Sequence, residues 1–273
     1  MLEGVRQWLH RTSTGFRSRG TPPLSEPVNG VTAFHLWWQG IDGGEPLVEV
    51  SATLSVLRQP TSDRLYFWAL QASFLSEDGA HGAAHIGLQW NPRHPESKAV
   101  NWGGYADISD VRSILDGTPS GLPSTPSDPN TRDYPWREGV PYRLRISRAS
   151  GGWEGSITDL ASGSTSIIRD LLASGDRLGS FVVWAEVFAA CNHSQTVAQW
   201  SDFEARTVSG DVRAPASVRL TFPTGGDCPN TVVVMSLTGL LQITNTVRTA
   251  RDAAVLPVPG RWLPPPGRRG RVV

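Results

Sequence analysis

The chain has 273 residues, of which 39% are hydrophobic and 18% charged, with 28 glycines and 21 prolines. This composition excludes a fibrous or largely disordered protein and is typical of a turn-rich globular one. Acidic and basic residues balance at 25 each, but arginines are concentrated in residues 1–20 and 261–273, so the body between them is acidic. An acidic body argues against a groove that binds nucleic acid.

The chain carries no recognisable export or membrane signal. Residues 1–20 are basic but lack the continuous apolar run of a signal peptide, and no later segment is apolar over the length of a membrane span. We therefore expect a cytoplasmic protein with no membrane partner, with secretion left open. A disulfide between Cys191 and Cys228 would require an oxidising compartment, so two free thiols are the interpretation that fits the missing signal.

Short β-branched or aromatic runs alternate with Gly, Pro, Asn and Asp clusters, which is the pattern of antiparallel strands. In Tyr142–Ser147 the apolar side chains alternate with Arg143 and Arg145, which we expect to point outward. The sequence predicts strands over residues 31–39, 47–57, 65–75, 84–90, 99–105, 142–147, 153–159, 178–189 and 197–206. This predicts an all-β protein, a two-sheet antiparallel jelly-roll sandwich with long loops.

Four regions follow from this pattern. Residues 1–28 read as a disordered or extended arm and 29–208 as the β-sandwich. Residues 209–256 read as a β segment, with strands at 217–222, 231–235 and 240–246, that packs on the sandwich or extends it. Residues 257–273 read as a flexible Pro/Arg-rich tail.

Two segments have helical spacing, residues 108–115 and 167–172, and predict short helical turns. Between them, residues 116–134 contain prolines at 119, 123, 126 and 129. This segment cannot form a central strand or a helix, so it is a long loop, either a cover over a site or a disordered segment.

The order of several aromatic and glycine motifs carries a resemblance. The motifs are Ile86-Gly87-Leu88-Gln89-Trp90, Trp102-Gly103-Gly104-Tyr105, Tyr134-Pro135-Trp136-Arg137-Glu138-Gly139, Tyr142-Arg143-Leu144-Arg145-Ile146, Trp153-Glu154-Gly155-Ser156-Ile157 and Trp200-Ser201-Asp202-Phe203-Glu204. Between Val31 and Arg206 the chain resembles an uncharacterised bacterial family on the concanavalin A-like (lectin/glucanase) jelly roll. The resemblance implies two facing sheets with a ligand on the concave one, and it implies no particular activity.

Trp184, Glu186 and Phe188 alternate along one strand and therefore share one face. Aromatic rings beside carboxyl and amide groups suit the apolar and hydroxyl faces of a sugar. The preferred interpretation is non-catalytic binding of a glycan or similar polar ligand on the concave face. The expected ligand-binding residues are His35, Trp37, Gln39, Gln71, Gln89, Trp102, Trp184 and Glu186.

A glycoside hydrolase or polysaccharide lyase is the enzymatic alternative. If Asp202 and Glu204 share a strand face with Trp200, they lie roughly 6.5–7 Å apart, within the carboxyl separation of inverting glycosidases. The resemblance implies a fold whose glycanases have a third acid at the place where this chain has Trp200, which argues against catalysis by this pair. Glu186 is the other candidate.

The aromatic neighbours of Glu186 would raise its pKa toward that of a general acid, unless the carboxylate pairs with an arginine such as Arg143 or Arg145 or accepts a hydrogen bond from a tyrosine. A structural or protein-interaction domain is the third interpretation. The oligomeric state is left open by the sequence.

The histidines do not predict a metal site. His81 and His85 are four apart on an expected strand, roughly 13 Å by rise, which is too far for one shared metal ion. The sequence also lacks a phosphate-binding glycine loop and a nucleophile elbow, so we expect no cofactor.

Overall fold

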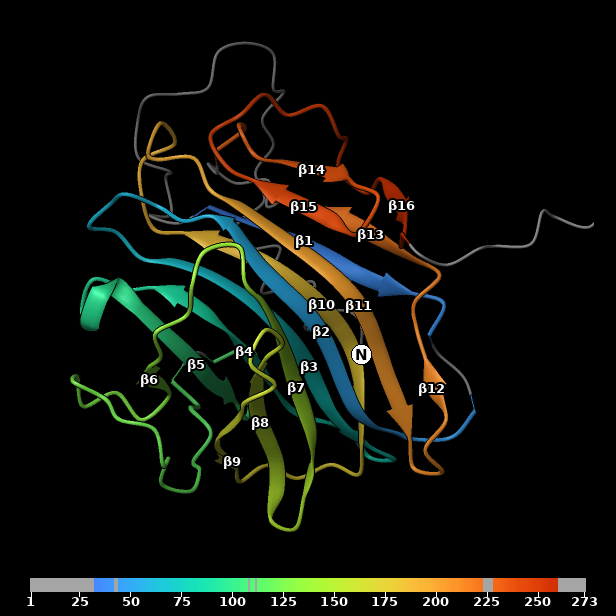
Figure 1. Ribbon diagram of the computed structural model, residues 1–273. Coiled ribbons are helices and arrows are strands. Elements are labelled where there is room, and N and C mark those ends of the chain that lie inside the picture. The colour runs from blue at the N-terminus through green and yellow to red at the C-terminus, as the bar shows by residue number, and fades with distance from the viewer. Residues whose placement is uncertain (1–31, 42–43, 108, 111, 223–227, 260–273) are drawn as a thin grey trace, which may run out of the picture.

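The computed structural model describes residues 32–41, 44–107, 109–110, 112–222 and 228–259. It is an antiparallel sandwich of two sheets, and the described residues contain almost no helix (Figure 1). This confirms the fold class that the alternating runs predict. The expected arm over residues 1–28 and most of the expected tail lie outside the described residues.

The first sheet has the strand order β16-β13-β1-β10-β3-β4-β5-β6. Its neighbouring strands all pair antiparallel. Their bounds are β1 Thr32–Gln39, β3 Tyr66–Ser76, β4 Gly79–Trp90, β5 Lys98–Tyr105, β6 Thr131–Asp133, β10 Arg177–Val187, β13 Ser217–Thr221 and β16 Val255–Pro257. A 3₁₀ turn, η1 (Pro95–Ser97), connects β4 to β5.

The second sheet has the order β14-β15-β11-β2-β7-β8-β9, and β12 pairs with β11. Its strands are β2 Leu47–Arg58, β7 Pro141–Ala149, β8 Gly152–Asp159, β9 Thr165–Leu171, β11 Val197–Thr207, β12 Val212–Arg213, β14 Val232–Met235 and β15 Leu240–Ile243. The segment after residue 209 thus adds strands to both sheets. Pro257 belongs to β16 and Val258 is buried, so these first two residues of the predicted tail are packed.

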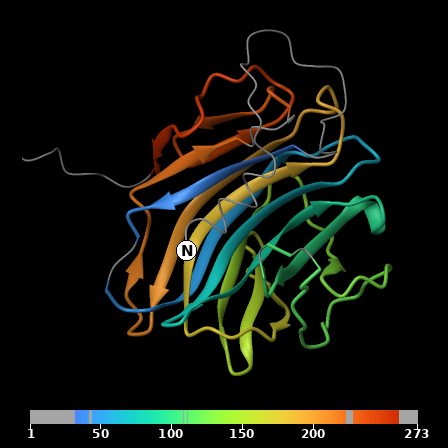
Figure 2. The ribbon, with the colours of Figure 1, turned by 180° about the vertical axis from the view of Figure 1, so that it is seen from behind.

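The core lies between the sheets and consists of the inward members of each alternating strand. Tyr142, Leu144 and Ile146 are buried there, as the alternation of Tyr142–Ser147 predicts. The ring of Phe74 on one sheet stacks on Trp153 of the other, with centroids 5.2 Å apart. A second and smaller apolar cluster lies on the outer face of the first sheet. Figure 2 shows the molecule from behind.

The helical turn predicted at residues 167–172 is wrong. Residues 167–172 fall largely in β9, where a bulge opposite Gly155 and Ser156 leaves Ile168 and Leu171 buried three residues apart. A bulge adds a residue to one strand, so the buried positions mimic helical spacing. Of the other predicted turn, residues 108–115, the structure describes 109–110 and 112–115, which contain no helix. The backbone N–H groups of Asp110 and Ser113 donate to the carbonyls of Asp107 and Asp110, so this part forms two successive turns. Asp107 also accepts bonds from the backbone and hydroxyl of Ser109.

Cys191 and Cys228 form a disulfide, which corrects the expectation of two free thiols. The bridge joins the segment after β10 to the segment before β14. The free-thiol prediction rested on the lack of a long apolar run in residues 1–20, and a sequence does not give the distance between Cys191 and Cys228. Within the described residues, no helix has the length and hydropathy needed to cross a membrane.

Candidate functional site

A cleft of about 380 Å³ opens on the outer face of the first sheet. Antiparallel pairing places three rows of residues side by side across β10, β3, β4 and β5. Directly paired residues point to the same face of a sheet. The rows are Glu186-Phe67-Gln89-Ala99, Trp184-Ala69-Gly87-Asn101 and Val182-Gln71-His85-Gly103. The cleft is therefore built by three strands that follow one another in the sequence, β3, β4 and β5, and by the distant strand β10.

Gln71 has a fixed orientation in this cleft. The indole Nε1 of Trp184 donates to Oε1 of Gln71 at 3.1 Å. An indole N–H can only donate, so the oxygen of the Gln71 carboxamide must face Trp184 and its NH₂ group must face away. That NH₂ group has no hydrogen-bond partner among the described residues and is left to meet a ligand.

His85 lies among aromatic rings at the centre of the cleft. Its ring centroid is 5.5 Å from Phe67, 5.5 Å from Trp184 and 6.3 Å from Tyr105. Burial lowers the pKa of His85 from 6.5 to about 4. The imidazole is therefore neutral near pH 7, and it offers one donor and one acceptor to a ligand.

Gln89 is oriented by a chain of bonds at the end of β4. The backbone N–H of Arg93 donates to Oδ1 of Asn91 at 3.2 Å, and Nδ2 of Asn91 donates to Oε1 of Gln89 at 2.9 Å. The first donor is a backbone N–H, so both side-chain amides are fixed in turn. As in Gln71, the carboxamide oxygen of Gln89 accepts a bond from the protein and its NH₂ group is left to meet a ligand in the cleft.

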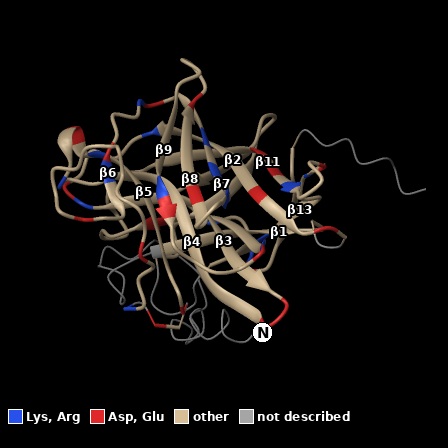
Figure 3. Cartoon of the chain, turned by 90° about the horizontal axis from the view of Figure 1, so that it is seen from below, with Lys and Arg blue, Asp and Glu red and all other residues tan. Residues whose placement is uncertain are grey.

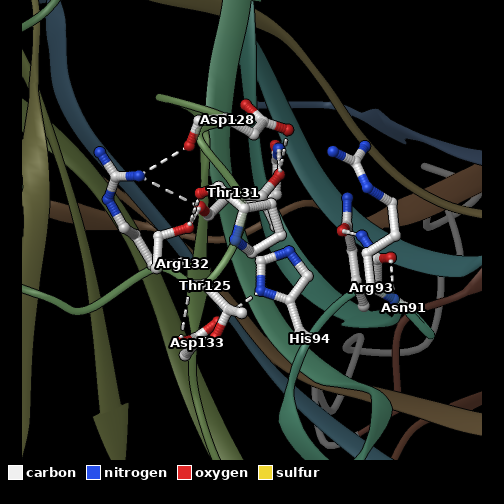
Figure 4. Close-up of polar contacts among 12 residues, drawn as sticks. Asn91, Arg93, His94, Thr125, Asp128, Thr131, Arg132 and Asp133 are labelled. Atoms are coloured by element: carbon white, nitrogen blue, oxygen red, sulfur yellow. Dashed lines mark hydrogen bonds and ion pairs between the residues drawn. The ribbon is translucent and has the colours of Figure 1, made fainter.

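The long loop before β6 forms one wall of the cleft. Asp128 accepts bonds from the backbone of Asn130 and the hydroxyl of Thr131, and its carbonyl accepts one from Arg132 (Figure 4). Buried His94 bonds Asp133 at 2.6 Å and ties the same loop to the start of β5. The prolines thus keep residues 116–130 out of strand and helix, and the loop is held in place by its own polar side chains and by His94.

Glu186 lines the cleft from β10 of the first sheet. It is half-buried, and the charged residues that line the cleft with it are Arg93 and Asp128. Burial, and after it the negative charge of Glu186, raises the pKa of the Tyr105 hydroxyl, so Tyr105 stays protonated. The cleft therefore combines one carboxyl group of the sheet with several neutral donors.

Four predicted ligand residues, Gln71, Gln89, Trp184 and Glu186, line this cleft. Trp102 does not, because its side chain points into the core and is fully buried. Its neighbours Asn101 and Gly103 face the cleft instead. The predicted strand is confirmed as β5, but Trp102 lies on its core face and not on its cleft face.

The predicted β1 residues lie beside the cleft without lining it. The ring of His35 stacks on Trp37 with centroids 6.1 Å apart, and Trp37 donates to the hydroxyl of Thr221 at 3.0 Å. Gln39 bonds the backbone carbonyl of Trp38 at 2.8 Å. β1 pairs directly with β10, the outermost of the cleft strands, so His35 and Trp37 lie at the edge of the cleft. Trp37 and Gln39 make their hydrogen bonds with residues outside it.

Asp202 and Glu204 lie in the other sheet and do not flank Trp200. Asp202 has φ 48° at a bulge in β11, so Trp200 and Phe203 are both buried and Glu204 points outward. Glu204 pairs with Arg143. The expected face shared with Trp200 is therefore wrong, because a bulge shifts the period by one.

The arginines proposed as partners of Glu186 also lie on the second sheet. Arg143 contacts Glu204, and Arg145 contacts Glu154 and Glu49. Figure 3 shows positive and negative segments mixed along β7, β8 and β11. These contacts form a charged outer surface on the sheet opposite the cleft, so neither arginine pairs with Glu186.

No group of three or more His, Cys, Asp or Glu side chains among the described residues is arranged to hold a metal ion. His81 contacts Asp78, away from His85. Sequence reasoning missed Phe67, Tyr105, Asn130 and the role of His85 as a cleft residue. The period of two along β4, which places His85 on the face of Gln89, was the available signal.

No family model and no curated protein matches the sequence. Among solved structures, the chain is similar to scytalido-glutamic peptidase bound to a peptide-based transition-state analogue, at 11% identity and a TM-score of 0.42. This match covers 82% of the chain and 99% of that structure. The resemblance to a concanavalin A-like bacterial family stays a prediction beyond the β-sandwich fold.

Two further matches are more partial. The alginate lyase from Klebsiella pneumoniae matches at 12% identity and a TM-score of 0.28, over 74% of this chain and 59% of that one. The enzymatically active domain of tailspike protein 2 from bacteriophage CBA120 matches at 14% identity and a TM-score of 0.29. This match covers 79% of this chain and 31% of that one. All three proteins are enzymes by name, but likenesses this distant assign no activity to the chain.

Proposed function

We propose that the cleft is the active site of a hydrolase that cleaves an amide bond in an extended polypeptide. The observation that carries this proposal is that Glu186 and the oriented Gln71 carboxamide line one cleft. They lie on neighbouring strands, four residues apart in register, roughly 13 Å by rise, so the two long side chains reach the cleaved bond from opposite ends. Glu186 serves as the proton-transferring group. Gln71 donates its NH₂ group to the carbonyl oxygen of the bond that is cleaved.

Amide hydrolysis needs a base that activates water, a donor that stabilises the oxyanion and an acid that protonates the leaving amine. In the proposed reaction, water adds to the carbonyl carbon while the Glu186 carboxylate takes its proton. Negative charge develops on the carbonyl oxygen, which the Gln71 NH₂ group stabilises. Glu186 then returns the proton to nitrogen, the C–N bond breaks, and a carboxylic acid and an amine leave.

Glycoside cleavage fits this cleft less well. The usual mechanism needs two carboxyl groups flanking the scissile bond. The cleft is lined by Glu186 and Asp128, but both oxygens of Asp128 are bonded within its own loop, by Asn130 and Thr131. A polyanionic glycan is also disfavoured, because these two acids face one lining cation, Arg93.

The donors of the cleft favour a ligand rich in acceptors. Gln71 and Gln89 each receive a bond at their oxygen and keep their NH₂ groups available. Carbonyl oxygens recur along an extended peptide, and each accepts such a bond. Phe67 and Trp184 add an apolar surface for side chains between the carbonyls.

The proposal is tested with a library of quenched-fluorescent decapeptides and a parallel panel of polysaccharides. We expect wild-type protein to cleave peptides, and Glu186→Gln to lower kcat/KM by about 10²–10⁴-fold while the fold is retained. Glu77→Gln makes the same chemical change in the exposed turn between β3 and β4 and is the matched control. It should leave cleavage unchanged.

Three outcomes would overturn the proposal. Cleavage of a polysaccharide but of no peptide would assign the cleft to a glycan-active enzyme. Binding of a glycan with no cleavage of either polymer would support the non-catalytic interpretation. Peptide cleavage that survives Glu186→Gln would place the reaction elsewhere.

A further inference from the structure

Asn130 repeats on the loop wall the arrangement that orients Gln71. Oδ1 of Asn130 accepts a hydrogen bond from Nη2 of Arg169 at 2.5 Å. A guanidinium can only donate, so the Asn130 oxygen must face Arg169 and its NH₂ group must face away. That NH₂ group has no hydrogen-bond partner among the described residues, and Asn130 lines the cleft.

Arg169 reaches Asn130 from the other sheet. It comes from β9 of the second sheet, is 5% exposed, and forms no ion pair among the described residues. Burial, and then the charge of Arg132, lowers the pKa of Arg169. Burying a guanidinium is costly unless its bonds are used, and one of them fixes Asn130.

Gly103 makes room for Asn130. A Cβ atom at position 103 would stand 2.7 Å from Cγ of Asn130, so only glycine lets this side chain lie over β5. Gly103 is in the same row as His85 and Gln71. The two oriented carboxamides thus stand on opposite sides of His85.

We propose that Asn130, oriented by Arg169, binds a second carbonyl oxygen of the substrate, away from the bond that is cleaved. The inference rests on the proposed amide hydrolysis and adds a binding residue to it. Gln71 and Gly103 are two strands apart, roughly 10 Å. That distance corresponds to about three residues of an extended peptide, so Asn130 meets a different carbonyl from Gln71.

The decisive variant is Asn130→Asp. Aspartate has the same shape and pairs more strongly with Arg169, so the loop stays in place, but the NH₂ donor is replaced by an acceptor. With the decapeptide that wild-type protein cleaves fastest, we expect KM to rise about tenfold and kcat to change little. Asn192→Asp changes an exposed asparagine outside the cleft in the same way and should have no effect.

A double-mutant cycle tests the positioning role of Arg169. Arg169→Met removes the donor, so the Asn130 amide is free to rotate, and we expect KM to rise as in Asn130→Asp. The double variant should be no worse than either single one, because both remove the same interaction. If Arg169→Met does not fold, Asn130→Asp alone decides.

The outcomes separate the two proposals. Peptide cleavage that depends on Glu186 with a KM unaffected by Asn130→Asp overturns this inference and leaves the proposed function standing. A fall in kcat with unchanged KM would mean that Asn130 acts on the scissile bond, which also overturns it. If no peptide is cleaved or bound, the proposed function fails and this inference fails with it.

Discussion

Gly155 of β8 packs so closely against the indole of Trp102 of β5 that a Cβ atom at position 155 would stand 2.5 Å from the ring. This contact joins the two sheets directly beneath the cleft. It also explains why Trp102 occupies the core, since the missing side chain of Gly155 provides space for a fully buried ring.

Gly155→Ala should therefore destabilise the protein by about 1–3 kcal/mol, because added volume in a packed core forces neighbouring side chains out of their preferred positions. The measurement is the free energy of unfolding from urea titration. Gly121→Ala, at a position with nothing within 4 Å of the added Cβ, is the control. Equal stability of the two variants would show that Trp102 does not pack against Gly155.

Trp184→Phe should weaken catalysis more than stability. Phenylalanine keeps most of the apolar contact with Phe67 but removes the donor to Gln71, which then loses its fixed orientation. We expect kcat/KM to fall about tenfold. Trp90→Phe removes an indole bond to the Ser62 carbonyl and should leave activity unchanged. If both variants behave alike, the bond to Gln71 has no role in the reaction.

Stability should decrease in mild acid because of His35. Burial lowers the pKa of His35 from 6.5 to about 4, so between these values the unfolded chain binds a proton that the folded protein does not. The free energy of unfolding therefore falls as the pH drops from about 6.5 to 4, by about 3 kcal/mol for this residue.

His85 shifts in the same direction. It is more open to solvent in the cleft and should contribute less. The measurement is urea unfolding at several pH values. In His35→Phe the slope between pH 6.5 and 4 should be smaller than in the wild type, and an unchanged slope would rule out His35 as its source.

The disulfide should be detectable and stabilising. Under denaturing conditions without a reductant, Cys191 and Cys228 should not react with iodoacetamide, and the intact mass should rise by two hydrogens on reduction. The bridge spans a sequence separation of 37, so the double Cys→Ser variant should lose about 4 kcal/mol on the loop-closure estimate. Two reactive thiols in freshly purified protein would restore the free-thiol prediction.

The period of two was enough to predict most of the strands and the all-β class, because a strand with one buried face must alternate. It also placed Trp184 and Glu186 on one face, and Gln71 and Gln89 on strands that proved to be neighbours. Local polar bonding was harder to foresee. Asp107 and Ser109 make a turn where apolar spacing predicted a helix.

Tertiary packing decides which face of each strand points into the core. Alternation fixes that Trp102 and Gly103 point to opposite sides, but only the contact with Gly155 shows which side is the core. The bulge at Asp202 reverses the expected face of Glu204, because one extra residue shifts the period. The pairing of Cys191 with Cys228 likewise depends on the approach of distant segments.

The candidate site could not be assembled from the sequence for the same reason. Strand pairing brings Gln71, His85 and Gly103 into one row, and a loop from beyond β5 adds Asn130 above it. Each orienting donor, Trp184 for Gln71 and Arg169 for Asn130, comes from a different strand from the amide it fixes. The sequence determined that strands carry polar residues on one face, and tertiary structure alone decided which of them meet, because hydrogen-bond geometry depends on distances between segments that are remote along the chain.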